Sequence, residues 1–131
     1  MNHLTNEVMR VNLDFNSETP IYLQLAQAVE DNIIKGIFRE EEQIPSTTEV
    51  SINYKINPAT VAKGFNLLVD DEIIYKKRGI GMFVCKGAKE KLIDKRRENF
   101  YENYVESLIA EAKKLDIGID EIIKMLERSK Q

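Results

Sequence analysis

The sequence predicts a mainly α-helical fold with a small β hairpin (α+β), and three observations support this prediction. Residues 57–69 begin with an Asn-Pro pair and then place apolar side chains at helical spacing. Residues 73–84 contain two short β-type segments around a basic turn with two glycines. Residues 88–131 carry two amphipathic helical patterns. A helix followed closely by a hairpin is the layout of a winged helix-turn-helix, here with a helical extension.

Length and composition fit one ordinary domain with a small appendage, because the chain has 131 residues. Hydrophobic residues make up 43% and charged residues 31%, which is the balance of a soluble folded protein. The sequence has neither an apolar run long enough to span a bilayer nor the pattern of a secretion signal, so we expect a cytoplasmic protein with no membrane partner. The single cysteine, Cys85, excludes an internal disulfide and fits a reducing compartment.

The N-terminal part of the chain is expected to lead into a first helix. Residues 1–18 lack a sustained period, although residues 11–15 alternate as in a short strand. Thr19 is expected to cap a helix whose first residue is Pro20, a position where the missing N–H costs nothing. Apolar residues at helical spacing extend this helix until Gly36 ends it.

Two further helices are expected in the next stretch, after a short connection at residues 37–44. Ser46 supplies an N-cap oxygen for a short helix over about residues 47–54. After a turn, Asn57 is expected to cap a third helix that begins at Pro58. The buried stripe of this third helix is expected at four apolar positions. These are Val61, Phe65, Leu68 and Val69.

The stripe determines which side chains of the third helix are free to bind. Four residues of this helix fall on or beside the face opposite to the stripe, where they can reach the base edges or phosphates of DNA. They are Ala59, Thr60, Lys63 and Asn66. The first exposed turn of the short helix adds Thr47 and Thr48, and one of the two is expected to contact DNA. Ser46 has two roles open to it, a phosphate contact at the helix N-terminus or a purely structural N-cap.

The hairpin is expected to have a tip that contacts DNA. Gly79 and Gly81 permit the positive φ angles that its turn needs. Lys76, Lys77 and Arg78 form a contiguous basic run, which in a hairpin favours contact with phosphates or with the minor groove. The alternative for this run is a solvated group of charges without a ligand.

Residues 88–131 are expected to form a dimerisation region after a winged domain at residues 19–87. A long helix runs to about residue 115, a break follows at residues 116–118, and a last helix carries an apolar face. Two helices of this size cannot bury their apolar faces alone. We therefore expect a homodimer, which would set two DNA readers about one turn of DNA apart; folding back onto the winged domain is the alternative. The expected dimer contacts are Phe100, Tyr104, Leu108, Ile119, Ile122, Ile123 and Leu126.

Four segments, taken in order, resemble the GntR family of bacterial transcriptional regulators. They are Pro20–Leu25, Ile44–Ser46, Asn57–Val61 and Arg78–Val84. Each segment alone is a weak signal, whereas their order and spacing are specific, and the resemblance covers about half of the chain. The short helical tail is similar to that of the YtrA-type subgroup, whose C-terminal part serves dimerisation. Members of that subgroup are often repressors.

The resemblance implies a sequence-specific DNA-binding regulator, a repressor that reads a pseudo-palindromic operator as a homodimer. Thr48 stands where the family usually has an arginine. We therefore expect a changed operator or a weaker specificity, because a threonine cannot make a bidentate contact to guanine. Lys63 and the Arg78-Gly79 pair match basic and wing-tip positions of the family pattern. The expected DNA-binding residues are Ser46, Thr47, Thr48, Asn57, Pro58, Ala59, Thr60, Lys63, Lys76, Lys77, Arg78, Gly79 and Gly81.

The charge balance leaves a second function class open. The formal net charge is −3, whereas a DNA-binding domain usually shows a basic footprint. The alternative is a winged-helix module that binds a protein or a ligand and has lost or altered DNA recognition. One histidine and one cysteine offer neither a metal cluster nor a catalytic dyad, so we expect no enzyme, no cofactor and no metal. A small-molecule effector bound between the tail helices, near Phe100, Tyr101 and Tyr104, is a further hypothesis.

Overall fold

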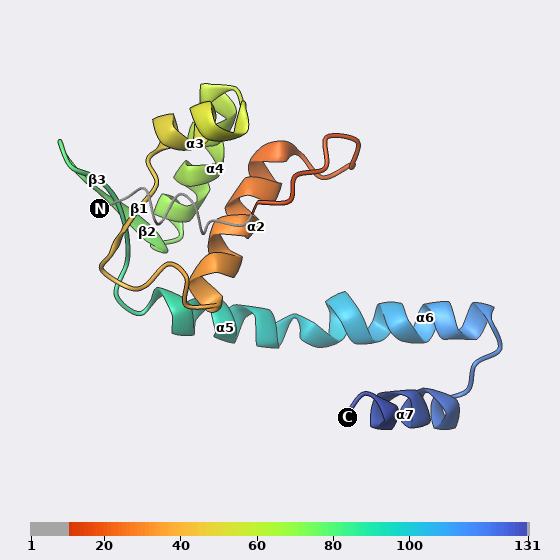
Figure 1. Ribbon diagram of the computed structural model, residues 1–131. Helices are drawn as coiled ribbons and strands as arrows, with labels where there is room; N and C mark the ends of the chain where they lie inside the picture. Colours follow the sequence, from red (N-terminus) through yellow and green to blue (C-terminus); the bar gives the residue numbers. More distant parts are fainter. Residues whose placement is uncertain (1–10, 131) are drawn as a thin grey trace. The chain divides into compact units, whose positions relative to one another are not determined.

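The computed structural model describes residues 11–130 of the chain. Its internal contacts divide the chain into two compact units after Ile93. Among the described residues, the first unit holds α2 to α4, the three strands and the start of α5, and the second holds the remaining helical segments (Figure 1). The elements are α2 (Ile21–Ile34), β1 (Gln43–Ile44), α3 (Thr47–Tyr54), α4 (Pro58–Asp70), β2 (Ile74–Lys77), β3 (Gly81–Val84), α5 (Ala88–Glu98), the π-helical segment η1 (Tyr101–Val105), α6 (Glu106–Lys114) and α7 (Ile119–Arg128).

The three strands form an antiparallel sheet in the order β1-β3-β2. The central strand β3 pairs with β1 through Phe83 opposite Gln43, and it pairs with β2 along its whole length. Lys77 lies opposite Gly81, so residues 78–80 form the turn of the β2–β3 hairpin. Figure 1 shows this hairpin extending away from the helices of the first unit. The predicted mainly α fold with a β wing is confirmed.

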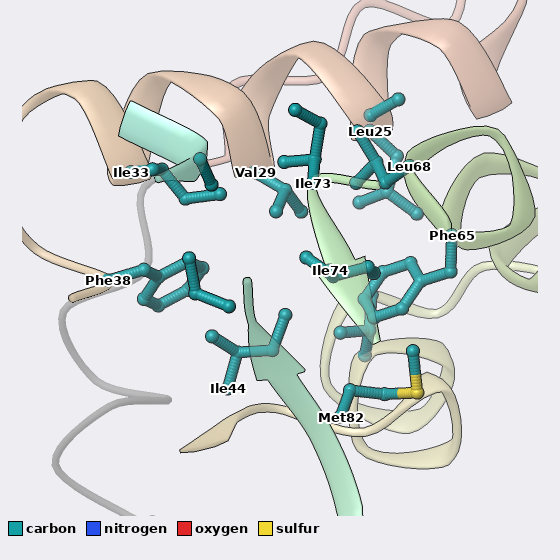
Figure 2. Close-up of a cluster of buried hydrophobic side chains, with 14 of the residues drawn as sticks. Leu25, Val29, Ile33, Phe38, Ile44, Phe65, Leu68, Ile73, Ile74 and Met82 are labelled. Atoms are coloured by element: carbon teal, nitrogen blue, oxygen red, sulfur yellow. The ribbon is translucent and has the colours of Figure 1, made fainter. Parts of the chain in front are cut away.

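The core of the first unit lies between α2, α4 and the inner face of the sheet. α4 packs on both α2 and α3, and Phe65 of α4 is only 2% exposed. Figure 2 shows side chains of α2 facing side chains of the sheet and of α4. Burial of this set stabilises the fold by roughly 1.5–3 kcal/mol for each large apolar side chain. The labelled members are Leu25, Val29, Ile33, Phe38, Ile44, Phe65, Leu68, Ile73, Ile74 and Met82.

A glycine brings α2 and α4 close together. A Cβ atom at Gly64 would lie 2.7 Å from the carbonyl oxygen of Tyr22, which is far inside a van der Waals contact. The absence of a side chain at Gly64 therefore allows the backbone of α4 to approach the backbone of α2. Gly64 is buried together with its neighbour Phe65, so the buried face of α4 includes a position that hydrophobic periodicity does not mark.

Two expectations for the start of the chain are wrong. Residues 11–15 form no strand in the part of the chain that the structure describes; Val11 and Leu13 pack against the core as irregular chain. Pro20, and not Thr19, occupies the N-cap position of α2. The carbonyl oxygen of Thr19 instead accepts a hydrogen bond from Nε2 of Gln24 at 2.8 Å, so a side chain of the first turn of α2 reaches back to the incoming chain.

Two details of the middle of the chain also differ from expectation. The connection before α3 contains β1, a two-residue strand that pairs with β3. Val69 is 36% exposed and not part of the core; it lies one residue before the end of α4. The remaining predicted stripe of α4, Val61, Phe65 and Leu68, is buried.

The second unit contains the rest of a long interrupted helix and one separate helix. α5 passes through η1 into α6, so the predicted long helix is present and ends at Lys114. Asp116 has a left-handed φ angle of +57° and marks the predicted break. The start of α5 belongs to the first unit, because Ala88 and Leu92 are buried in its core. None of the described helices is long and apolar enough to cross a membrane.

Candidate nucleic-acid interface

The N-terminus of α3 is closed by a capping box. Oγ of Ser46 accepts a hydrogen bond from the backbone N–H of Glu49 at 3.0 Å, and Oε1 of Glu49 accepts one from the backbone N–H of Ser46 at 2.9 Å. These bonds fix the first turn of the helix, where Thr47 is half-buried and Thr48 is exposed. Of the threonine pair, Thr48 therefore presents its side chain to solvent.

The turn between α3 and α4 is fixed by side chains as well as by backbone. Lys55 ends α3 in the left-handed conformation, with a φ angle of +54°. Oγ of Ser51 donates a hydrogen bond to the carbonyl oxygen of Ile56 at 2.7 Å. Burial raises the pKa of the Tyr54 hydroxyl, which packs against the core at the end of α3. This short turn sets the angle at which α4 leaves α3.

The N-terminal end of α4 is open to solvent. Oδ1 of Asn57 accepts a hydrogen bond from the backbone N–H of Ala59 at 2.8 Å, which confirms the predicted cap. Asn57, Pro58 and Ala59 are exposed, and Thr60 is half-buried. A helix N-terminus carries a partial positive charge and favours an anion. This end of α4 therefore suits a phosphate or a base edge.

Lys63 is exposed on α4 and has a partner that the sequence pattern did not indicate. Its Nζ atom lies 4.1 Å from the centre of the Tyr22 ring on α2. Such a cation–π contact contributes roughly 0.5–1 kcal/mol at an exposed site. Tyr22 thus holds the ammonium group near the junction of α2 and α4, and Asn66 is exposed one turn further along α4.

The wing brings the three predicted basic residues together in one hairpin. Lys76, Lys77 and Arg78 are all exposed. The backbone N–H of Ile80 donates to the carbonyl oxygen of Lys77 at 2.9 Å, which closes a β-turn with Gly79 at a φ angle of +78°. The turn places Arg78 at the free end of the hairpin, where its guanidinium can reach a ligand.

The outer face of the hairpin carries an aromatic pair with a cation above it. The rings of Tyr75 and Phe83 are stacked with their centres 5.7 Å apart. Nζ of Lys77 lies 4.6 Å from the centre of the Phe83 ring. Cross-strand pairs of this kind stabilise a hairpin by about 0.2–1 kcal/mol. Lys77 therefore also supports the hairpin that presents Arg78.

A second side chain that the sequence pattern missed is Gln43 of β1. Its Nε2 atom donates a hydrogen bond to the carbonyl oxygen of Ile80 in the wing turn, at 3.0 Å. Gln43 and Tyr22 both act on residues about 40 positions away along the chain. A prediction from local spacing has no signal for such contacts.

Two acidic clusters of the first unit, at residues 41–42 and 70–72, lie away from the start of α4 and from the hairpin turn. Asp70 is the last residue of α4, and Asp71 and Glu72 follow it; the 13 residues of the helix span about 20 Å. Backbone hydrogen bonds place Glu41 and Glu42 beside Val84, at the end of β3 that is opposite to the turn. The formal net charge of −3 is therefore compatible with a basic hairpin tip.

The predicted dimer residues lie in the second unit and are largely exposed. The rings of Phe100 and Tyr104 are in contact, with centres 5.4 Å apart. Ile122 is half-buried, and the other members are at least 46% exposed. Exposed fractions are 56% for Phe100, 65% for Tyr104, 46% for Leu108, 68% for Ile119, 47% for Ile123 and 58% for Leu126. Among residues 11–130, no group of three or more His, Cys, Asp or Glu side chains is arranged to hold a metal ion.

Comparison with known proteins connects the first unit to a family. The family model of the bacterial regulatory proteins of the gntR family matches residues 21–84, from the start of α2 to the end of β3. The HTH-type transcriptional repressor YtrA of Bacillus subtilis (strain 168) is 33% identical over 84 residues. That alignment spans 64% of this chain and 65% of YtrA, just under two thirds of its length.

Two solved structures extend the likeness to the second unit. One is a protein from Bacteroides thetaiotaomicron assigned to the GntR family of transcriptional regulators, with 40% identity and a TM-score of 0.63; the match covers 82% of this chain and 94% of that one. The other is YtrA from Sulfolobus acidocaldarius, a GntR-family transcription factor, with 26% identity and a TM-score of 0.56, covering 91% and 95% of the two chains.

Proposed function

The chain belongs to the GntR family of bacterial regulatory proteins, and from that premise we propose that it is a transcriptional repressor that binds a pseudo-palindromic DNA operator as a homodimer. The relatives to which it is similar are transcriptional regulators and not enzymes. The matched segment coincides with the unit that carries α3, α4 and the wing. We therefore assign DNA binding to the first unit.

One observation carries the proposal: a single compact unit exposes both the capped start of α4 and a basic hairpin turn. α4 is a rigid rod that fits the major groove, since that groove admits one α-helix. Thr48, Thr60 and Lys63 are the side chains we assign to base edges or to nearby phosphates. Arg78 at the hairpin turn is assigned to the flanking backbone or to the minor groove.

The other predicted residues fit positioning contacts to the DNA backbone. Ser46 and Asn57 make helix caps, so any phosphate contact adds to a structural role they already have. Half or more of protein–DNA hydrogen bonds go to phosphates and sugars and set the register of the protein on the duplex. We assign this role to Ser46, Thr47, Asn57, Ala59, Lys76, Lys77, Gly79 and Gly81. Pro58 has no N–H to donate, so we assign it a van der Waals contact with the DNA.

The homodimer is supported by the apolar side chains that the second unit leaves exposed. A soluble monomer seldom exposes several large apolar side chains on neighbouring helical turns unless they bind a partner. A second copy of the chain presents the same side chains, and a two-fold axis matches the symmetry of a palindromic operator. We propose that residues 19–87 bind DNA and residues 88–131 dimerise.

DNA titration at several salt concentrations tests the proposed function. The probe is a duplex from the region upstream of the gene, compared with a scrambled duplex of the same composition. We expect tight binding to the first, with an affinity that falls steeply as salt rises, because Lys and Arg side chains displace counterions from phosphates. Equal weak binding to both duplexes at low salt would reject the proposal.

Replacement of the wing arginine, Arg78, tests its role in the same salt titration. Arg78→Ala should weaken binding to every sequence and reduce the slope of log affinity against log salt by about one. Lys35→Ala, at an exposed position that follows α2, is the control and should leave the slope unchanged. Thr48→Ala and Lys63→Ala should instead change the ranking of operator variants.

A further inference from the structure

The tip of the wing is held by very few bonds. Its turn runs from Lys77 to Ile80 and is closed by the backbone hydrogen bond between these two residues, 2.9 Å long. Gly79 has a φ angle of +78°, as position i+2 of a type II turn requires. Arg78, Gly79 and Ile80 are all exposed, and Ile80 is 61% exposed, so packing against the core does not hold them.

Gln43 supplies a bond to this tip from another strand. β1 places Gln43 opposite Phe83, and its Nε2 atom donates to the carbonyl oxygen of Ile80 at 3.0 Å. The next residue, Ile44, is 1% exposed and anchors β1 in the core. Gln43 therefore lies on a strand that is anchored in the core, and its side chain bonds to a turn that does not pack against the core.

The space for Gln43 depends on a missing side chain in the wing. A Cβ atom at Gly81 would lie 2.6 Å from Nε2 of Gln43 and 3.5 Å from its Cδ atom. The amide group of Gln43 thus lies directly over the Cα atom of Gly81. Gly81 also has a φ angle of +146°, which disfavours any other residue. The glycine and the glutamine fit each other across the β1–β3 pair.

We infer that Gln43 is a positioning residue for DNA binding: its amide fixes the wing turn and so sets how Arg78 meets the duplex. This inference rests on the proposed function. Without the bond to Ile80, the turn would sample more conformations, and DNA would have to order it at a cost in conformational entropy. Gln43 need not touch DNA for this effect, since it acts through the backbone of the turn.

A double-mutant cycle on the full-length protein tests the inference. Gln43→Met keeps the length of the side chain and removes its donor. With the operator duplex as probe, we expect Gln43→Met to weaken binding by roughly three- to tenfold, the size of one lost neutral hydrogen bond. In the Arg78→Ala background the same change should have almost no further effect, because the side chain that the turn positions is gone. Full additivity of the two losses, or no loss for Gln43→Met, would overturn the inference.

A readout on the free protein separates positioning from general damage. Amide hydrogen exchange at Ile80 should become at least several-fold faster in Gln43→Met, while exchange at Phe65 in the core should stay the same. Gln27→Met is the matched control, because Gln27 is an exposed residue of α2, and it should change neither exchange nor DNA affinity. Faster exchange at Phe65 to the same degree would indicate a merely structural role and would contradict the inference.

The outcomes for the inference and for the proposed function differ. If Arg78→Ala leaves DNA binding unchanged, the proposed role of the wing fails, whatever Gln43→Met does. If Arg78→Ala weakens binding and Gln43→Met leaves both DNA binding and the exchange of the Ile80 amide unchanged, only the inference about Gln43 fails.

Discussion

A single methyl group added at position 64 would bring α4 into a steric clash with α2. Gly64→Ala would place a Cβ atom 2.7 Å from the carbonyl oxygen of Tyr22, which is backbone and cannot rotate away. We expect a net loss of about 1–2 kcal/mol in the free energy of unfolding: overpacking costs about 1–3 kcal/mol, and the higher helix propensity of alanine returns up to about 1 kcal/mol.

Urea denaturation measures this loss, and an exposed position on the same helix provides the control. Asn66→Ala, at an exposed position on α4, should leave the stability the same or slightly raise it. A Gly64→Ala variant as stable as the parent protein would show that α2 and α4 are further apart than described.

Cys85 is predicted to be a slow nucleophile. Burial raises the pKa of its thiol, and the nearby carboxylate of Glu72 adds to the increase, while Lys91 opposes it. A raised pKa means that less thiolate is present at pH 8 than for a free cysteine, and the thiolate is the reactive form. Alkylation by iodoacetamide should therefore be slower in the folded protein than in urea, and its pH midpoint should be higher. Equal rates in the two states would contradict the described surroundings of Cys85.

At the scale of the element, the capping box of α3 makes a separate prediction. Ser46→Ala removes the oxygen that accepts from the backbone N–H of Glu49, and loss of an N-cap side chain costs typically about 1 kcal/mol. The free energy of unfolding should fall by that amount, measured by urea denaturation. Thr48→Ala, in the same turn but exposed, should leave stability within about 0.5 kcal/mol. A Ser46→Ala variant with unchanged stability would show that the cap does not hold α3.

The ends of helices could be predicted where local chemistry sets them. Ser46 and Asn57 cap α3 and α4 as expected, because an N-cap acts within three residues of itself. β1 was not predicted, since its two residues become a strand only when they pair with β3. The expected strand at residues 11–15 failed for the opposite reason: alternation is present, but that part of the described chain pairs with no strand.

For the candidate site too, some features could be predicted from the sequence and others could not. Exposure of Lys63 and of the wing arginine follows from helical and strand periodicity, which the sequence displays. The contacts of Tyr22 with Lys63 and of Gln43 with Ile80 could not be predicted, because each joins residues about 40 positions apart along the chain. Val69 was assigned to the core by its apolar character, whereas the buried face of α4 includes Gly64 in its place.

For the whole molecule, the proposed homodimer gives a direct prediction. Ile123→Asp places a charge among the exposed apolar side chains of α7 and should raise the dimer dissociation constant by about tenfold or more, since an unpaired charge in an interface is costly. Lys124→Asp introduces the same residue on the opposite side of α7 and should have little effect. Analytical ultracentrifugation measures both. Equal association of the two variants would remove this face from the interface.

The central claim, that two winged units of one dimer read a symmetric operator, is tested most directly by selection from a random duplex library with the full-length protein. We predict enrichment of an inverted repeat whose half-sites have centres about 10 base pairs, or a multiple of one helical turn, apart. The same selection with Arg78→Ala should recover the repeat with lower affinity. Recovery of no common sequence, or of a single half-site bound by one chain, would contradict the account.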